Sequence, residues 1–209
     1  CALSILPVSL PHTGGMAVPR SRALAFIVCL GVVSLFADMT YEGARSILGP
    51  FLSGLGASAA AVGVIAGFGE MLAAGLRLFT GRLVDRTGAY WTMTVLGYGL
   101  TVVAAAMMAM ARTWEVAALL VVLERTGKSL RGPARDVLLS AATGEVGHGS
   151  GFGLHAAMDQ TGAVLGPLLV MGVVAKGHGY GPAFARLAIP GVLALGALFV
   201  ARLWNPIHP

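Results

Sequence analysis

Charge is scarce in this sequence. Asp, Glu, Lys and Arg together make up 11% of its 209 residues, and the mean hydropathy is +0.82. Soluble domains are typically about one quarter charged, so this composition excludes a protein with a large water-exposed surface and predicts one that faces lipid. The net charge of +5 is interpreted as basic residues that gather on cytoplasmic loops, and no nucleic-acid partner is expected.

Cysteine is nearly absent as well. The chain has 2 cysteines, Cys1 and Cys29, and such a pair, with one member at the chain terminus, makes no disulfide framework. The sequence also lacks a phosphate loop of the Walker type and a cluster of metal-ligand residues. We therefore expect no cofactor and no metal site.

A catalytic serine is the one enzymatic alternative that the sequence offers. Ser150 lies near His148 and His155, an arrangement similar to the Ser/His pair of an intramembrane hydrolase. Such a site needs a serine deep in a cavity, whereas Ser150 is expected at a helix start, where it serves as a cap. The chain is therefore predicted not to be an enzyme.

Long uncharged runs take the place of charge. Together with apolar length, they predict an all-α membrane protein with six transmembrane helices at about 23–52, 59–79, 90–111, 116–134, 151–175 and 182–203, because a helix of about 20 apolar residues spans the bilayer. In the fourth span the uncharged run is only 116–123, so the later charges of this span are expected to face protein or a water-filled cavity. The distribution of Lys and Arg favours a cytoplasmic N-terminus and a cytoplasmic C-terminus. Residues 1–15, which precede Met16, are expected to be a non-native or disordered leader before a bundle at 16–209.

A charged segment with the sequence GRLVDRTG, at 81–88, separates the second run from the third. It is predicted to be a tight loop at one membrane face. It resembles the loop between the second and third spans of the major facilitator superfamily through four residues, Gly81, Asp85, Arg86 and Gly88. The resemblance implies a cytoplasmic gating latch, in which Asp85 contacts a helix N-terminus of an opposite half and Arg86 pairs with Asp136 at the inner end of the fourth span.

The fourth and fifth predicted spans resemble the same family. Arg125 is the counterpart of an arginine embedded in the family's fourth span, where it could hold an anionic substrate group or tune proton release from a carboxylate. A salt bridge from Arg125 to Glu42 or Glu124 is the structural alternative. In the fifth span a kinked, closely packed pivot is implied by three residues, Gly162, Gly166 and Pro167.

Ionisable residues inside the spans are the candidates for a substrate or proton path. Asp38, Glu42 and Arg45 are spaced by four and three residues, which places them on one helical face. Glu42 is expected to pair with Arg45 and to leave Asp38 free. This face either lines a central cavity, where it contacts substrate or protons, or forms a structural ion pair between helices. The other candidates on the path are Glu70, Arg125 and Asp159.

Two further interpretations concern the ends of the fourth and fifth spans. Asp159 follows His155 by four residues, so the two could relay a proton or form a hydrogen-bonded pair between helices. Arg131, Arg135 and Asp136 are expected on the cytoplasmic side, as anchors that follow the positive-inside rule.

The six spans group as two triplets, at about 23–111 and 115–203, and three crossings in each triplet invert one relative to the other. In the family that the chain resembles, such inverted repeats build one half of the transporter. The resemblance implies the N-terminal half of a secondary transporter that moves a small solute by alternating access across the plasma (inner) membrane.

The partners implied are a small-molecule substrate, the lipid bilayer, and either a C-terminal half that this sequence lacks or a second half-sized chain. Coupling to protons through Asp38, Glu42 or Asp159 is a hypothesis. The alternative is a six-span membrane scaffold or regulatory subunit that transports nothing.

Overall fold

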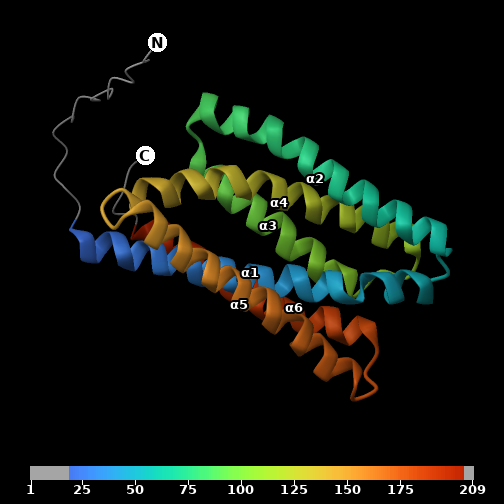
Figure 1. Cartoon of the computed structure of the whole chain (residues 1–209). Coiled ribbons are helices and arrows are strands. Elements are labelled where there is room, and N and C mark those ends of the chain that lie inside the picture. The colour runs from blue at the N-terminus through green and yellow to red at the C-terminus, as the bar shows by residue number, and fades with distance from the viewer. Residues whose placement is uncertain (1–18, 205–209) are drawn as a thin grey trace, which may run out of the picture.

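The computed structural model describes residues 19–204, and every regular element in this part of the chain is a helix. The helices are α1 (Arg20–Gly54), α2 (Ala59–Thr87), α3 (Tyr90–Met108), α4 (Trp114–Thr143), α5 (His148–Val174) and α6 (Tyr180–Leu203). Successive helices run in opposite directions, so the beginning of α1 and the end of α6 lie at the same end of the bundle (Figure 1). The leader expected at 1–15 lies outside the described residues.

Apolar sequence explains why these segments form long helices. Five of the six described helices, all but α4, are long and apolar enough to cross a membrane. The predicted starts of the spans agree with the observed helices to within three residues. Ser58 before α2 and Thr113 before α4 accept hydrogen bonds from Ala61 N and Val116 N, which satisfies backbone donors that a helix start leaves free. The predicted all-α fold is therefore confirmed for the described residues, and five of its helices could cross a membrane.

The charged segment at 81–88 is not the loop that was predicted. Residues 81–87 form the last two turns of α2, and the helix ends only at Gly88. Charged side chains do not interrupt backbone hydrogen bonding, so the segment stays helical until a residue changes the backbone. Gly88 does so with a φ of 62°, a left-handed conformation that favours glycine, while its N–H bonds to Val84 O at 2.9 Å.

The helices pack around α1 and α4. α1 packs against α5 and α6, α4 packs against α2 and α3, and α3 also touches α6. α2 lies at the edge of the bundle (Figure 1), and its buried residues are few: Gly69, Thr80 and Val84.

Apolar cores form at both ends of α1 and α4 and leave a polar zone between them. One core contains Ala44 to Leu52 of α1 together with Ala117 to Val121 of α4. In the same core, the ring centroids of Phe51 and Phe184 lie 4.9 Å apart. The other core contains Ala23 to Leu30 of α1 and Leu138 to Ala142 of α4. Asp38 and Glu42 of α1 and the charged residues of α4 from Glu124 to Asp136 fall between these two cores.

Candidate functional site

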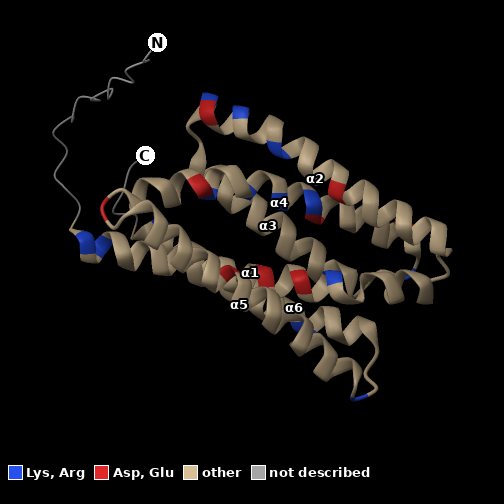
Figure 2. Ribbon diagram, in the orientation of Figure 1, with Lys and Arg blue, Asp and Glu red and all other residues tan. Residues whose placement is uncertain are grey.

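Charged side chains of α1, α2, α4 and α5 meet in the middle of the bundle. Figure 2 shows acidic and basic positions partway along α1, α2 and α4, between apolar stretches. We call these residues the central charged cluster: Asp38, Glu42, Arg45, Glu70, Arg77, Glu124, Arg125, Lys128, Arg131, Arg135 and Asp159.

Asp38 of α1 and Arg131 of α4 form the tightest ion pair of the cluster. Arg131 Nη2 donates to Asp38 Oδ1 at 2.9 Å, and both side chains are largely buried. Two predictions are therefore wrong, because Asp38 is not free and Arg131 is not at the cytoplasmic end. The fourth helix continues to Thr143 instead of ending near 134, which places Arg131 well inside it. The guanidinium also lies 4.4 Å from the centre of the Tyr98 ring.

Glu70 connects α2 to both α1 and α4. Its Oε1 lies 3.6 Å from Arg45 Nη2 and 3.4 Å from Arg125 Nη2. The predicted pair of Glu42 with Arg45 is present, with 3.5 Å between Glu42 Oε2 and Arg45 Nη1. Arg125 thus pairs with Glu70, and not with Glu42 or Glu124, the two acids that the sequence suggested.

Tyr41 lies between two cations of α4. The Arg125 guanidinium is 4.7 Å from the centre of the Tyr41 ring, and Lys128 Nζ is 3.5 Å from it. Each contact has cation–π geometry. Lys128 Nζ is also 3.8 Å from Glu42 Oε1. The tyrosine ring therefore contacts two positive charges in the middle of the bundle.

Asp159 of α5 pairs with Arg135 and not with His155. Arg135 Nη1 lies 3.7 Å from Asp159 Oδ1, whereas His155 Nε2 lies 3.0 Å from Ser34 Oγ. Ser34 Oγ also accepts from Arg135 Nη1 at 3.1 Å and lies 3.2 Å from the Tyr98 hydroxyl. The predicted direct pair of His155 with Asp159 is replaced by a network that Ser34 organises. Arg135, expected on the cytoplasmic side, is part of this network.

Glu124 was not predicted as a site residue. It is 3% exposed, and its Oε1 has no hydrogen-bond partner among the described residues. The signal in the sequence is the spacing of the α4 charges: Glu124, Lys128, Arg131 and Arg135 recur every three or four residues and share one side of the helix. The same spacing would have found Lys128, Arg131 and Arg135.

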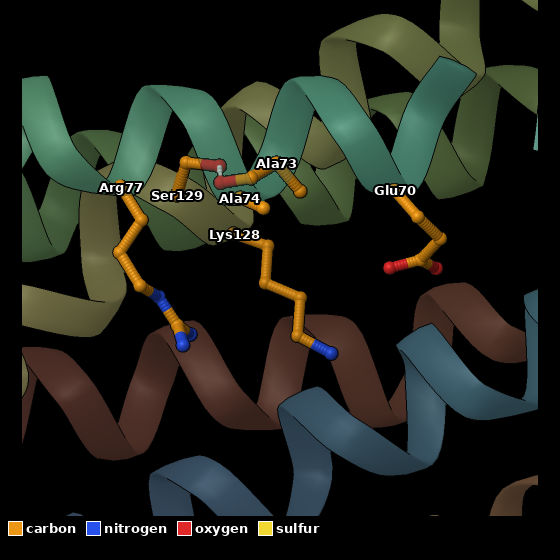
Figure 3. Close-up of a pocket in the computed structure, with 6 residues that line it drawn as sticks. All are labelled: Glu70, Ala73, Ala74, Arg77, Lys128 and Ser129. Carbon is orange, nitrogen blue, oxygen red and sulfur yellow. Dashed lines mark hydrogen bonds between the residues drawn. The ribbon is translucent and has the colours of Figure 1, made fainter. Parts of the chain in front are cut away.

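Cavities border the cluster. One of about 290 Å³ is lined by Glu70, Arg77 and Lys128 together with Ala73, Ala74 and Ser129 (Figure 3). Another, of about 110 Å³, is lined by Asp38, Arg77, Lys128, Arg131, Gly132, Arg135 and Asp159. A third, of about 350 Å³, includes Arg45, Glu70 and Arg125 in its lining. The predicted path residues Asp38, Arg45, Glu70, Arg125 and Asp159 thus line cavities, and Glu42 joins them through Lys128.

The predicted gating residues lie at the end of α2 nearest to α3. Asp85 and Arg86 are exposed in the last turns of α2. Within 19–204, neither has an ion-pair partner. Asp136 instead pairs with its neighbour Arg135, whose Nη2 donates to Asp136 Oδ1 at 3.0 Å. The predicted pair of Arg86 with Asp136 is therefore not formed. The contact expected of Asp85 with an opposite half stays a prediction.

The predicted pivot residues place α5 directly on the backbone of α1. A Cβ atom added at Gly162 would collide with the carbonyl of Leu35, and one added at Gly166 would collide with that of Met39. Pro167 follows inside α5 without ending the helix. Glycine is thus required for the close approach, while movement about this contact stays a prediction.

Ser150 is not arranged as a nucleophile. It lies in the first turn of α5, and its Oγ donates to the carbonyls of Gly147 and Val146 at 3.0 and 3.2 Å. It therefore does not cap the helix in the way that was predicted, since a capping serine accepts from a backbone N–H. His148 and His155 bond elsewhere, to Thr143 and Ser34.

Comparison with known proteins identifies relatives over most of the chain. The family model of the Major Facilitator Superfamily matches residues 24–209. An uncharacterized protein of Mycobacterium tuberculosis is 49% identical over 185 residues, which cover 88% of this chain and 45% of that protein. An uncharacterized MFS-type transporter of Methanocaldococcus jannaschii is 26% identical over 84% of this chain and 44% of its own length.

A shorter match links the chain to a protein with a more specific name. Multidrug resistance protein MdtH of Cronobacter sakazakii is 34% identical over 119 residues, which are 57% of this chain and 29% of that protein. The chain spans less than half the length of each of these relatives.

Proposed function

Because the chain belongs to the major facilitator superfamily, whose members are membrane transporters, we propose that it forms the N-terminal half of a secondary transporter that moves a small solute by alternating access. The single observation that carries the proposal is the central charged cluster. Ionic side chains at this depth are tolerated where they pair with one another or border water-filled space. In this bundle they pair with one another and border cavities, between two apolar cores.

The pattern of helix neighbours supports a bundle built from two inverted repeats, 23–111 and 115–203. If α1, α2 and α3 are exchanged for α4, α5 and α6, the contact of α1 with α5 becomes that of α4 with α2. Likewise, the contact of α3 with α4 becomes that of α6 with α1, and both contacts exist. Family transporters place the substrate near the interface of such repeats. A six-span half with cytoplasmic termini in the plasma membrane fits this arrangement.

The substrate path that we propose includes Asp38 and Glu42 of α1 and Arg125 of α4. Asp38 is held by Arg131, so it acts by fixing that guanidinium. Glu42 is held by two long contacts, at 3.5 and 3.8 Å from its two cations. A solute or a proton that binds Glu42 therefore displaces only long ion-pair contacts. Asp159, at 3.7 Å from Arg135, is the second group suited to proton coupling.

Uptake by proteoliposomes tests the proposal. The complete gene product is reconstituted with Arg125→Gln and Glu42→Gln variants, and solute accumulation is measured with and without an imposed proton gradient. We expect accumulation by the parent protein and at least a tenfold loss in both variants, since each loses one charged contact of about 1.5–3 kcal/mol. Arg112→Gln, between α3 and α4, and Glu115→Gln, in the first turn of α4, change exposed residues and are matched controls. Solute accumulation that is unchanged in both the Arg125→Gln and the Glu42→Gln variants would overturn the assignment of these residues to the substrate path.

A further inference from the structure

One basic side chain of the central charged cluster lacks an acidic partner. Five cations each lie within ion-pair distance of a carboxylate: Arg45, Arg125, Lys128, Arg131 and Arg135. Arg77 of α2 has no such carboxylate among residues 19–204. Arg77 is exposed and lines a cavity, so its charge is available to a negative group from outside this bundle.

Arg77 lines two polar cavities, one between α2 and α4 and a smaller one that Asp38 of α1 and Asp159 of α5 also line. Figure 3 shows its side chain and that of Lys128 extending to the same side of the two helices, with Glu70 farther along α2. The guanidinium lies against Gly132, where a Cβ atom would be 3.2 Å from Arg77 Nη2. The missing side chain at Gly132 therefore leaves room for the arginine to reach into the cavity.

Arg131 gives a second, independent indication from the opposite wall. It is 2% exposed, and its Nη1 is buried without a hydrogen-bond partner in the described part of the chain. Buried donors are rarely left unsatisfied, because each one that is unpaired costs about 1–3 kcal/mol. The cavity of about 110 Å³ that Arg131 lines is large enough to admit such a partner, since a water occupies about 30 Å³ in the liquid.

The charges that line this smaller cavity do not balance. Four cations, Arg77, Lys128, Arg131 and Arg135, face two acids, Asp38 and Asp159. The acids are engaged by Arg131 and Arg135, and Arg135 also pairs with Asp136, which does not line the cavity. Lys128 Nζ is 3.8 Å from Glu42, its nearest carboxylate, which is beyond hydrogen-bond distance. An added anion would neutralise the excess, whereas a cation would increase it and a neutral solute would leave it unchanged.

We propose that Arg77, Lys128 and Arg131 bind the oxyanion group of an anionic substrate, a phosphate or a carboxylate. The inference rests on the proposed transport function and names the substrate class of the same site. A guanidinium offers two parallel N–H donors to neighbouring oxygens, and an ammonium acts as a compact positive charge. Arg77 of α2 and Arg131 of α4 therefore donate hydrogen bonds to the oxyanion, and Lys128 adds a positive charge beside them.

Binding and transport are measured separately with four probes: inorganic phosphate, succinate, choline and glucose. The purified complete gene product is titrated with each probe while its thermal unfolding is followed. The same protein in proteoliposomes is then assayed for uptake of each radiolabelled probe. We expect phosphate or succinate to stabilise the parent protein, and phosphate against succinate separates the two kinds of oxyanion.

Arg77→Gln should weaken that binding roughly tenfold to hundredfold, the loss expected for one charged hydrogen bond. Arg77→Lys should retain part of the anion binding, because lysine keeps the positive charge but lacks the two parallel N–H donors of the guanidinium. Arg77 is exposed in this bundle, so both variants should fold. Arg186→Gln, at an exposed arginine of α6, is the matched control and should bind as the parent does.

Each combination of outcomes decides a different question. Anion binding that Arg77→Gln abolishes supports the inference, even if no probe is transported, and in that case the transport proposal alone fails. Uptake of choline or glucose without binding of either anion overturns the inference and leaves the transport proposal standing. Anion binding that is equal in Arg77→Gln and the parent overturns the site, and no binding and no uptake of any probe overturns both proposals.

Discussion

Arg131 Nη2 and Asp38 Oδ1, 93 residues apart in the sequence, are joined at 2.9 Å. The pair ties α4 to α1 in the zone between the two apolar cores. Removing one partner of a buried ion pair leaves an uncompensated charge, which typically costs about 3–5 kcal/mol.

We therefore expect Asp38→Asn to lower the melting temperature of the purified protein markedly, and Asp38→Asn with Arg131→Gln to lower it less than the sum of the single changes. Thermal unfolding in detergent, analysed as a double-mutant cycle, measures this coupling. Glu115→Gln, at an exposed acid of α4, should leave the melting temperature unchanged. Strictly additive effects would show that the pair contributes nothing.

The contact of α5 with α1 depends on the absence of a side chain. Gly166→Ala introduces a Cβ that collides with the Met39 carbonyl, and such overpacking costs about 1–3 kcal/mol or more because backbone must move. Gly172→Ala, on the same helix, meets no atom within 4 Å and is the matched control. The yield of monodisperse protein in size-exclusion chromatography should fall for the first variant alone, and equal yields would refute the close packing.

We expect Tyr41 to stabilise the fold through its aromatic ring and not through its hydroxyl. The ring lies between Arg125 and Lys128, and each cation–π contact contributes about 0.5–2 kcal/mol. Tyr41→Phe should keep the stability of the parent protein, whereas Tyr41→Leu should lose about 1–3 kcal/mol in chemical unfolding experiments. A loss for Tyr41→Phe as large as that for Tyr41→Leu would assign the effect to the hydroxyl.

Asp85 offers a test of the gating latch that separates function from folding. Its side chain is exposed and makes no ion pair in the described bundle, so Asp85→Asn should change stability by less than about 0.5 kcal/mol. If the latch operates against an opposite half, the same change should reduce uptake by proteoliposomes severalfold. Arg82→Gln, three residues earlier on α2, controls for the charge of the segment. Unchanged uptake by the Asp85→Asn variant would contradict the gating role of Asp85.

The sequence predicted the positions of the helices better than their ends. Hydrophobic length located five of the six described helices, all but α4, and the starts of α2 and α4 follow from capping residues at Ser58 and Thr113. The end of α2 was missed because Asp85 and Arg86 are charged. A charged side chain indicates that a residue contacts water or a partner, but it does not mark where the helical hydrogen bonds end. The end of α4 was missed for the same reason.

The sequence did not predict which charged residues of different helices pair with one another in the site. Spacing along one helix predicted the pair of Glu42 with Arg45, which is local. The pairs of Glu70 with Arg125 and of Asp38 with Arg131 depend on how α2, α1 and α4 are aligned along their lengths. That alignment is set by the packing of many side chains, which no single motif encodes.

The charges of α4 have a consequence for how the chain enters the membrane. Between Glu124 and Asp136 this helix carries six ionisable residues, and each charge at the centre of a lone helix opposes insertion by about 2.5–3.5 kcal/mol. Asp38 and Glu70, which meet Arg131 and Arg125, are translated before α4. Because α1 and α2 precede α4 in the chain, their acidic residues are already synthesised when α4 is inserted. We therefore expect insertion of α4 to be coupled to its packing against α1 and α2.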